Sequence, residues 1–184
     1  MKVIAFTGAG ISKSAGIPTF EEVPNLREKL SIDYKEQHPV DFKRAINSLK
    51  DSVKDKKPTK AHLALAKYNV PIITMNVDGL HTKAGSKNVI EIHGNAEKDN
   101  IVLYGENILR SQDCIDLFKT TAEQARKNGE NVTLLIIGTS MQTQFADGIM
   151  YIASSMKMNI KYINKNADEE VPKFLKENCK TKQS

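Results

Sequence analysis

Three short segments carry the side chains that could do chemistry. They are GAGIS at 8–12, TMNVDGLH at 74–81 and EIHG at 91–94. Each lies at the end of an apolar run of strand length, and the loops at the carboxyl ends of strands form the ligand-binding edge of an open α/β sheet. Their order along the chain predicts an enzyme that binds a dinucleotide.

His93 closes one of these runs and is followed by Gly94, so its ring is expected to face that edge. An imidazole with a pKa of about 6.5 suits general-base chemistry near neutral pH. The alternative is a polar side chain that only fills space at a strand end. His62 and His81 are expected to be structural, and His38 carries no signal.

Asn76 and Asp78 lie at the end of the apolar run 70–77. In a pocket, their amide and carboxylate groups could bind a ribose or a carboxamide. They could instead cap the next helix or bond to their own backbone. Their position at a strand end favours the pocket.

Gly8 and Gly10 lie between an apolar run and an expected helix. Glycine there lets the backbone approach a pyrophosphate, whose charge the amides of a helix N-terminus can meet. Gly16 comes too late for the G-x-G-x-x-G fingerprint, and no acidic residue ends a second strand at the usual distance. A plain strand-to-helix turn is the alternative.

Small polar residues follow two further runs. Gly138, Thr139 and Ser140 come after the run 132–137, and Asn164 follows the last run. They could hold a phosphate or a ribose, or they could cap the helices that follow.

The elements that must position these residues follow from the apolar pattern. Runs of strand length recur at 3–7, 70–77, 89–93, 100–104, 132–137 and 159–163. Several lack alternation, as strands covered on both faces do. One helical pattern runs from Ser111, a candidate N-cap, to the Asn128-Gly129 stop, and another spans Pro58 to Lys67 with Thr59 as cap. The predicted fold class is α/β with a parallel sheet.

Residues 17–58 interrupt this alternation, because a simple βαβ unit would reach its second strand sooner. Pro24, Pro39 and an apolar spacing across 40–49 indicate helices and loop. We therefore expect a small helical lobe inserted after the first strand of a single domain.

Composition narrows the class of protein further. The 184 residues carry a net charge of +5, but the lysines are interleaved with acidic residues, and Trp is absent, so no nucleic-acid partner is expected. Cys114 and Cys179 are too far apart for metal-ligand spacing. No window predicts a signal peptide or a membrane span. These features predict a protein of the reducing cytoplasm, and they leave its oligomeric state open.

The segments resemble the motifs of the sirtuin family, the NAD-dependent protein lysine deacylases. GAGISKSAGIPTF is similar to the family's GAGIS-x-x-SGIP-x-F, TMNVDGLH to TQNIDGLH, and VIEIHG to the catalytic His-Gly motif. IVLYGE resembles the substrate-pairing V-x-FGE segment and GTSMQ the GTSL motif. PTKAHLAL and HTKAG also align, so the resemblance covers most of positions 2–165.

The resemblance implies a Rossmann-like domain that binds NAD, with a smaller lobe over it. By analogy, His93 would be the base acting on the nicotinamide ribose, with Asn76 beside it in catalysis. Contacts to NAD would come from Gly8, Ala9, Gly10, Ile11, Ser12, Phe20, Met75, Asn76, Asp78, Gly138, Thr139, Ser140 and Asn164. Backbone pairing with an extended acyl-lysine peptide would come from Leu103, Tyr104, Gly105 and Glu106.

Three departures from the family pattern matter. Most sirtuins bind structural zinc with two Cys pairs between the His-Gly and FGE motifs, but only residues 95–102 intervene here, so no zinc-binding module is expected. Glu21 follows Phe20 where the family usually has Arg near the NAD phosphates, although Lys13 or Arg27 could compensate. Met75 replaces a Gln, which removes a hydrogen-bonding side chain beside the ribose.

Three activities therefore stay open. The first is a minimal, zinc-free deacylase, which His93, Asn76 and the peptide-pairing segment favour. The second is ADP-ribosyl transfer or NAD hydrolysis, which needs the same pocket and which Glu21 and Met75 make credible. The third is a catalytically weak module that binds NAD or ADP-ribose.

Overall fold

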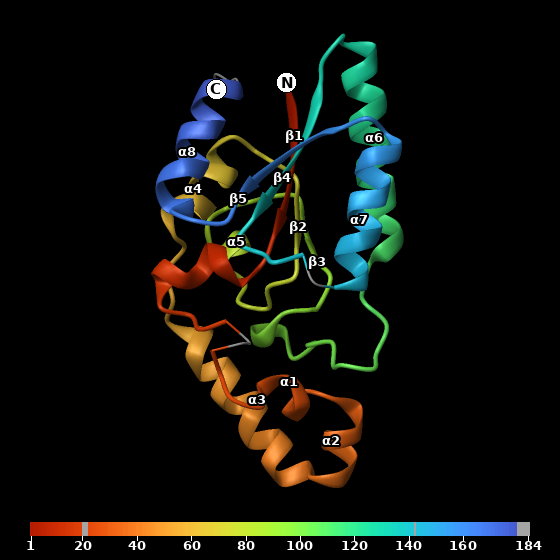
Figure 1. Cartoon of the computed structure of the whole chain (residues 1–184). Coiled ribbons are helices and arrows are strands. Elements are labelled where there is room, and N and C mark those ends of the chain that lie inside the picture. Colours follow the sequence, from red (N-terminus) through yellow and green to blue (C-terminus); the bar gives the residue numbers. More distant parts are fainter. Residues whose placement is uncertain (20–21, 142, 180–184) are drawn as a thin grey trace.

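The computed structural model describes residues 1–19, 22–141 and 143–179. Its centre is a five-stranded sheet in the order β3-β2-β1-β4-β5 (Figure 1). The strands are β1 (Lys2–Thr7), β2 (Ile72–Thr74), β3 (Val89–Glu91), β4 (Val132–Ile137) and β5 (Asn159–Ile163). All four strand pairs are parallel, which confirms the predicted α/β class.

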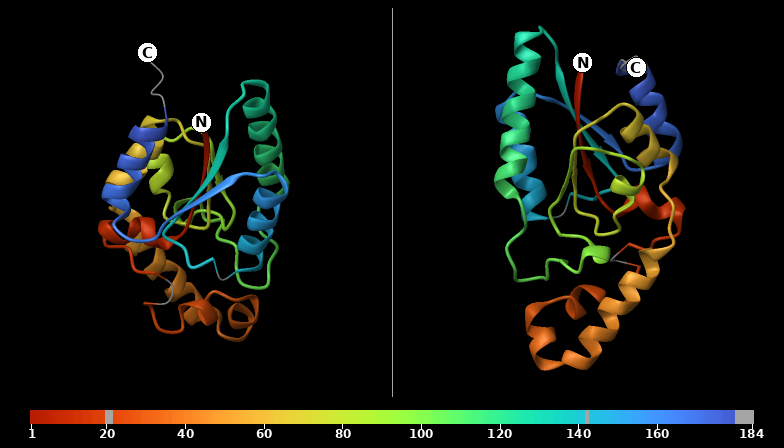
Figure 2. Two further views of the ribbon diagram at one scale, coloured as in Figure 1. Left: turned by 45° about the horizontal axis from the view of Figure 1, so that its top comes forward. Right: turned by 180° about the vertical axis from the view of Figure 1, so that it is seen from behind.

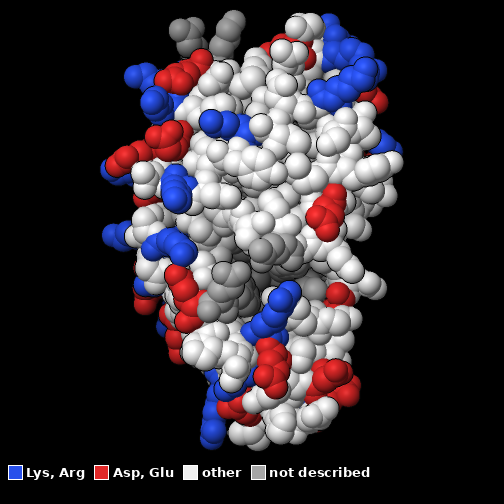
Figure 3. All heavy atoms as spheres, viewed as in Figure 1, with Lys and Arg blue, Asp and Glu red and all other residues white. Residues whose placement is uncertain are grey.

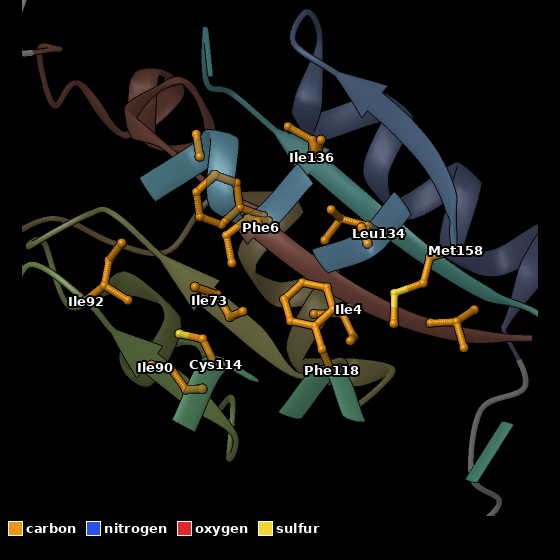
Figure 4. Close-up of a cluster of buried hydrophobic side chains, with 14 of the residues drawn as sticks. Ile4, Phe6, Ile73, Ile90, Ile92, Cys114, Phe118, Leu134, Ile136 and Met158 are labelled. Carbon is orange, nitrogen blue, oxygen red and sulfur yellow. The ribbon is translucent and has the colours of Figure 1, made fainter. Parts of the chain in front are cut away.

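Helices cover both faces of the sheet (Figures 1 and 2). One face carries α6 (Ser111–Lys127) and α7 (Gln144–Ser155), and the other carries α4 (Lys60–Lys67), α5 (Leu80–Lys83) and α8 (Ala167–Asn178). Alternate residues of β1 serve the two layers: Ile4 and Phe6 pack with the first pair of helices (Figure 4), and Val3 and Ala5 with α4 and α8. Burial on both faces explains why the sequences of β1, β2 and β4 do not alternate.

The two predicted helices form, and their ends differ in one detail. Thr59 caps α4 in a capping box with His62, as expected for an N-cap threonine. At α6, Ser111 is the first helical residue, and the cap position belongs to Arg110 with φ 57° and no side-chain cap bond. The N-cap prediction for Ser111 is therefore wrong, whereas Gly129 ends the helix with φ 63°.

The predicted strand at 100–104 is also wrong, because this segment makes only an isolated bridge between Tyr104 and Ser31. The amide of Val102 donates to the His93 carbonyl at 2.9 Å, outside the sheet. The apolar character of the segment has another cause: Leu103 is buried, and Ile101 packs with a small cluster that includes Val53 and Leu80.

Residues between β1 and α4 form a 3-10 helix, η1 (Ala9–Ala15), and then α1 (Leu26–Lys29), α2 (Ile32–Gln37) and α3 (Pro39–Lys54). The last three lie beyond the carboxyl edge of the sheet, at the bottom of Figure 1. Leu49 and Val53 of α3 pack against Val77 and Leu80 beside that edge. Among the described residues, every helix is too short or too polar to cross a membrane.

Candidate active site

The strand ends converge at one edge of the sheet. In the strand register Thr7 pairs with Thr74 on one side and with Ile137 on the other. The chain leaves β1 toward β2 and later returns to β4 on the opposite side, which makes this the switch point of the sheet. The loops that contain GAGIS, TMNVD and GTS therefore meet there.

Gly8 and Gly10 must be glycine because the loop after β1 lies directly against the loop after β4. A Cβ on Gly10 would lie 2.6 Å from Gly138 Cα, and one on Gly8 would lie 2.7 Å from Thr139 Cβ. The amide of Gly10 donates to the Gly138 carbonyl at 2.8 Å. The chain beyond β1 is thus closed onto the chain beyond β4, a contact that the sequence did not reveal.

A buried polar cluster joins η1 to the loop after β2. Ser12, Asn76 and Asp78 are at most 6% exposed. Ser12 Oγ donates to Asp78 Oδ2 at 2.6 Å and accepts from Asn76 Nδ2 at 3.2 Å. Asp78 Oδ1 accepts from the Leu80 amide at 2.9 Å, so this carboxylate bonds to the backbone two residues further on and also binds Ser12. The bond to the local backbone is one of the two readings of the N-x-D pattern, and ligand binding, the other reading, stays a prediction.

This cluster forms one wall of a cavity of about 350 Å³. Ala9 and Ser12 of η1 and Asn76 and Asp78 of the loop after β2 line it on the side of the sheet edge, and residues of α3 that include Ser52 line it from the other side. Figure 3 shows the surface hollowed where the body meets α1 to α3. A space of this size suits a small-molecule ligand.

His93 is half-buried in the loop after β3, and its Nδ1 lies 3.1 Å from the Met75 carbonyl oxygen. Because a carbonyl only accepts, Nδ1 carries a proton, and Nε2 of the neutral ring keeps a lone pair. Burial lowers the pKa of His93, and the Met75 carbonyl offsets part of that effect. Nε2 is therefore the acceptor that a general base needs, and it makes no hydrogen bond within the described residues.

Gly94 allows the chain to turn directly after this histidine. Its φ is +76°, and a Cβ there would lie 1.8 Å from the Asn100 carbonyl oxygen. Asn100 Oδ1 also accepts from the Asn95 amide at 2.8 Å. The short link 95–102 thus folds back onto the end of the His-Gly segment.

The remaining predicted cofactor residues differ in placement. The side chain of Ile11 is 1% exposed and packs in the core, so only its backbone could face a ligand. The Thr139 amide donates to Asn164 Oδ1 at 3.2 Å, which joins the loops after β4 and β5, and Ser140 is exposed. Phe20 and Glu21 lie outside the described residues.

The two residues that could compensate for Glu21, Lys13 and Arg27, have other partners. Lys13 pairs with Glu22 at 2.9 Å, and the Arg27 guanidinium lies 5.0 Å above the ring of Tyr104. Neither contact links a cation to the polar cluster.

The segment expected to pair with a peptide is already paired on one side. The Tyr104 amide donates to the Leu30 carbonyl at 2.9 Å, and the Tyr104 carbonyl accepts from the Ile32 amide at 3.1 Å. The Leu103 amide donates to Glu106 Oε2 at 2.8 Å. Within the described part of the chain, the backbone groups of Gly105 and the carbonyl of Glu106 make no hydrogen bond.

Asp168 holds the segment after β1 in place from outside the cavity, and the sequence analysis missed it. It lies in the first turn of α8, and its carboxylate accepts from Ser14 Oγ at 2.7 Å and from the Ala61 amide at 3.1 Å. It therefore ties η1 to the start of α4. The only signal was the acidic run at 168–170, in the first turn of the helix that follows the last strand. Across residues 1–19, 22–141 and 143–179, no three His, Cys, Asp or Glu side chains gather as metal ligands would.

The comparisons with known proteins fit this geometry. The Sir2 family model matches residues 8–100. An NAD-dependent protein deacetylase of Thermodesulfovibrio yellowstonii is 30% identical over 202 residues, which cover 88% of this chain and 78% of that protein. The chain belongs to the Sir2 family. The resemblance read from its five motifs is thereby confirmed.

Other family members match a shorter region. An NAD-dependent protein deacetylase of Sulfolobus acidocaldarius is 41% identical over 127 residues, 64% of this chain and 49% of that protein. The chain spans about half the length of the first three such relatives. A solved structure of Sir2 with a p53 peptide and NAD⁺ has a TM-score of 0.78 and 24% identity over 96% of this chain and 92% of that one, so the two share a fold.

Proposed function

We propose that the chain is an NAD-dependent protein lysine deacylase that releases nicotinamide and O-acyl-ADP-ribose. The observation that carries this proposal is the meeting of two features at one sheet edge. One is His93 with an acceptor at Nε2, and the other is the buried cluster of Ser12, Asn76 and Asp78 beside a cavity. The names of the matching relatives, protein deacetylases and deacylases that depend on NAD, support it.

The donor set fits NAD. Asn76 uses its amide nitrogen on Ser12, which leaves Oδ1 for a ligand hydroxyl or carboxamide. The exposed Ser140 and Asn164 and the backbone of 8–12 would hold the rest of the dinucleotide. When bound, NAD would supply the bond between nicotinamide and ribose that is cleaved. His93 would accept a proton at Nε2, and Met75 would hold its ring through Nδ1.

We also propose that residues 17–58 act as the small lobe over this site and that no zinc module supports it. The link 95–102 supplies packing instead, because Ile101 joins the cluster of Ile17 and Val53, and Lys50 pairs with Asp99. The interspersed charges over α1 to α3 in Figure 3 support a protein partner rather than a nucleic acid. The two free cysteines support a cytoplasmic location.

A second candidate is peptide-independent cleavage of NAD, as hydrolysis or ADP-ribosyl transfer. The observation that favours it is the prior pairing of Tyr104 with Leu30 and Ile32, which leaves little free backbone for a peptide.

Nicotinamide release from NAD, measured with and without an acetyl-lysine peptide, separates the candidates. The deacylase predicts release that depends on the peptide. Release without the peptide would support the second candidate, and binding of NAD without release would leave only a binding module.

A further inference from the structure

A chain of buried hydrogen bonds runs from His81 of α5 to Asn76, one of the residues that line the cavity. His81 Nε2 lies 2.9 Å from Thr7 Oγ1, and Thr7 Oγ1 donates to Thr74 Oγ1 at 2.8 Å. Thr74 Oγ1 also accepts from the Asn76 amide at 3.1 Å. The two threonines end β1 and β2 in register, so their hydroxyls lie side by side.

The protons of this chain can be placed. A threonine hydroxyl has one proton, and that of Thr7 is donated to Thr74. Toward His81, Thr7 is therefore the acceptor, and His81 must donate from Nε2. Nδ1 of the neutral ring then keeps its lone pair, and that buried atom has no partner in the described part of the chain.

Because Nδ1 of His81 has no partner among the described residues, packing alone does not explain why position 81 is a histidine. His81 is 2% exposed, and its ring centroid lies 4.5 Å from that of His62. A buried polar atom without a hydrogen bond costs stability. An apolar side chain would fill the same space without that cost, so the donor at Nε2 is the feature that requires a histidine.

Asn76 is held at two points as a result. Thr74 holds its backbone, and Ser12 holds its side-chain nitrogen. Its Oδ1 is left to face the cavity that Asn76 lines. Loss of the Thr74 contact would leave the backbone of Asn76 without this anchor.

We propose that His81 is a positioning residue that orients Asn76 through the hydroxyls of Thr7 and Thr74. The catalytic consequence rests on the proposed function, whereas the structural link between His81 and Asn76 does not.

The test compares variants that remove the link with variants that keep it. Thr74→Val and His81→Leu remove an acceptor and a donor. Thr74→Ser retains the hydroxyl, and Gln in His81→Gln can donate from its own Nε2. Thr133→Val is the matched control, because Thr133 is buried to a similar degree on β4 but donates to Met1 Sδ at the opposite end of the sheet.

We expect Thr74→Val and His81→Leu to lower kcat at least about tenfold while KM for NAD changes less than about threefold, as loss of an orienting contact does. Thr74→Ser and His81→Gln should restore most of kcat, and Thr133→Val should change nothing. A folded Thr74→Val enzyme with wild-type kcat would overturn the proposal, and so would equal losses in His81→Leu and His81→Gln.

A second measurement does not depend on turnover. Exchange of the Asn76 backbone amide, followed by NMR, should speed up at least about tenfold in Thr74→Val and in Thr7→Val, and should be unchanged in Thr133→Val. Thr7→Val replaces His81→Leu where the latter does not fold. Unchanged exchange in both threonine variants would refute the link, while an inactive wild-type protein with faster exchange in these variants would refute only the deacylase.

Discussion

Nδ1 of His93 is bonded to the carbonyl oxygen of Met75 at 3.1 Å, so the loop after β2 fixes the ring that follows β3. This contact fixes which nitrogen is protonated and leaves Nε2 as the acceptor. Met75, which stands where the family pattern has Gln, therefore still helps to orient His93, through its backbone carbonyl.

The pH dependence of catalysis follows from this contact. Burial lowers the pKa of His93 below its ordinary value of about 6.5. The ring must be neutral to act as a base, so kcat/KM should be constant at neutral pH and fall as the pH drops through the lowered pKa. A profile of kcat/KM against pH checks this, and an acidic limb centred at or above about pH 6.5 would contradict it.

His93→Ala should lower kcat by about 10²-fold or more, because a general base contributes about 10²–10⁴-fold. NAD affinity, measured by calorimetry, should stay within about threefold, since the base holds little of the ligand. His38→Ala is the control, because His38 is exposed on the lobe. Equal rates in the His93 and His38 variants would remove His93 from the mechanism.

Acid should destabilise the protein in part through His62. Burial lowers its pKa to about 4, against about 6.5 when unfolded. Between these two pKa values the unfolded state therefore binds more protons than the folded state. The contribution of His62 to the free energy of unfolding is intact above about pH 6.5 and falls by up to about 1.4 kcal/mol per pH unit as the pH drops toward 4. His62→Gln keeps a side chain suited to the capping box but cannot titrate. Urea unfolding at several pH values should show a shallower acid loss in this variant, and an identical loss would contradict the assignment.

Gly94→Ala should lower the free energy of unfolding by about 3 kcal/mol or more, because a Cβ would meet the Asn100 carbonyl oxygen in addition to the left-handed strain. Gly129→Ala is the matched control: its φ is +63° and nothing lies within 4 Å of the added atom, so it should cost about 1 kcal/mol. Similar losses from the two substitutions would show that the link 95–102 does not press on Gly94.

Much of the site could be predicted because local patterns specify it. The polar residues at strand ends, the Thr59 cap and the continuous strands β1, β4 and β5 follow from period and turn chemistry. The pairs Gly10 with Gly138 and Thr7 with Thr74 could not, because they depend on strand order, which no local pattern encodes. The segment 100–104 misled for a related reason: it is apolar because it packs beside the lobe, and burial alone does not distinguish that from a strand.

Chelation of metals should change neither the melting temperature nor turnover. Packing of Ile101 and the hydrogen bond of Asn100 hold residues 95–102 in place, at the position where the family pattern has a zinc module. Asn100→Ala, by contrast, should lower the melting temperature through loss of its bond to the Asn95 amide. Stoichiometric zinc in the purified protein, lost together with activity on chelation, would contradict this prediction.

The central claim is tested most directly by the stoichiometry of products from NAD and an acetyl-lysine peptide. The deacylase account predicts equal amounts of nicotinamide, deacylated peptide and O-acyl-ADP-ribose from the wild-type protein, and none of the three from His93→Ala. Nicotinamide formed without deacylated peptide, or deacylated peptide formed without NAD, would contradict it.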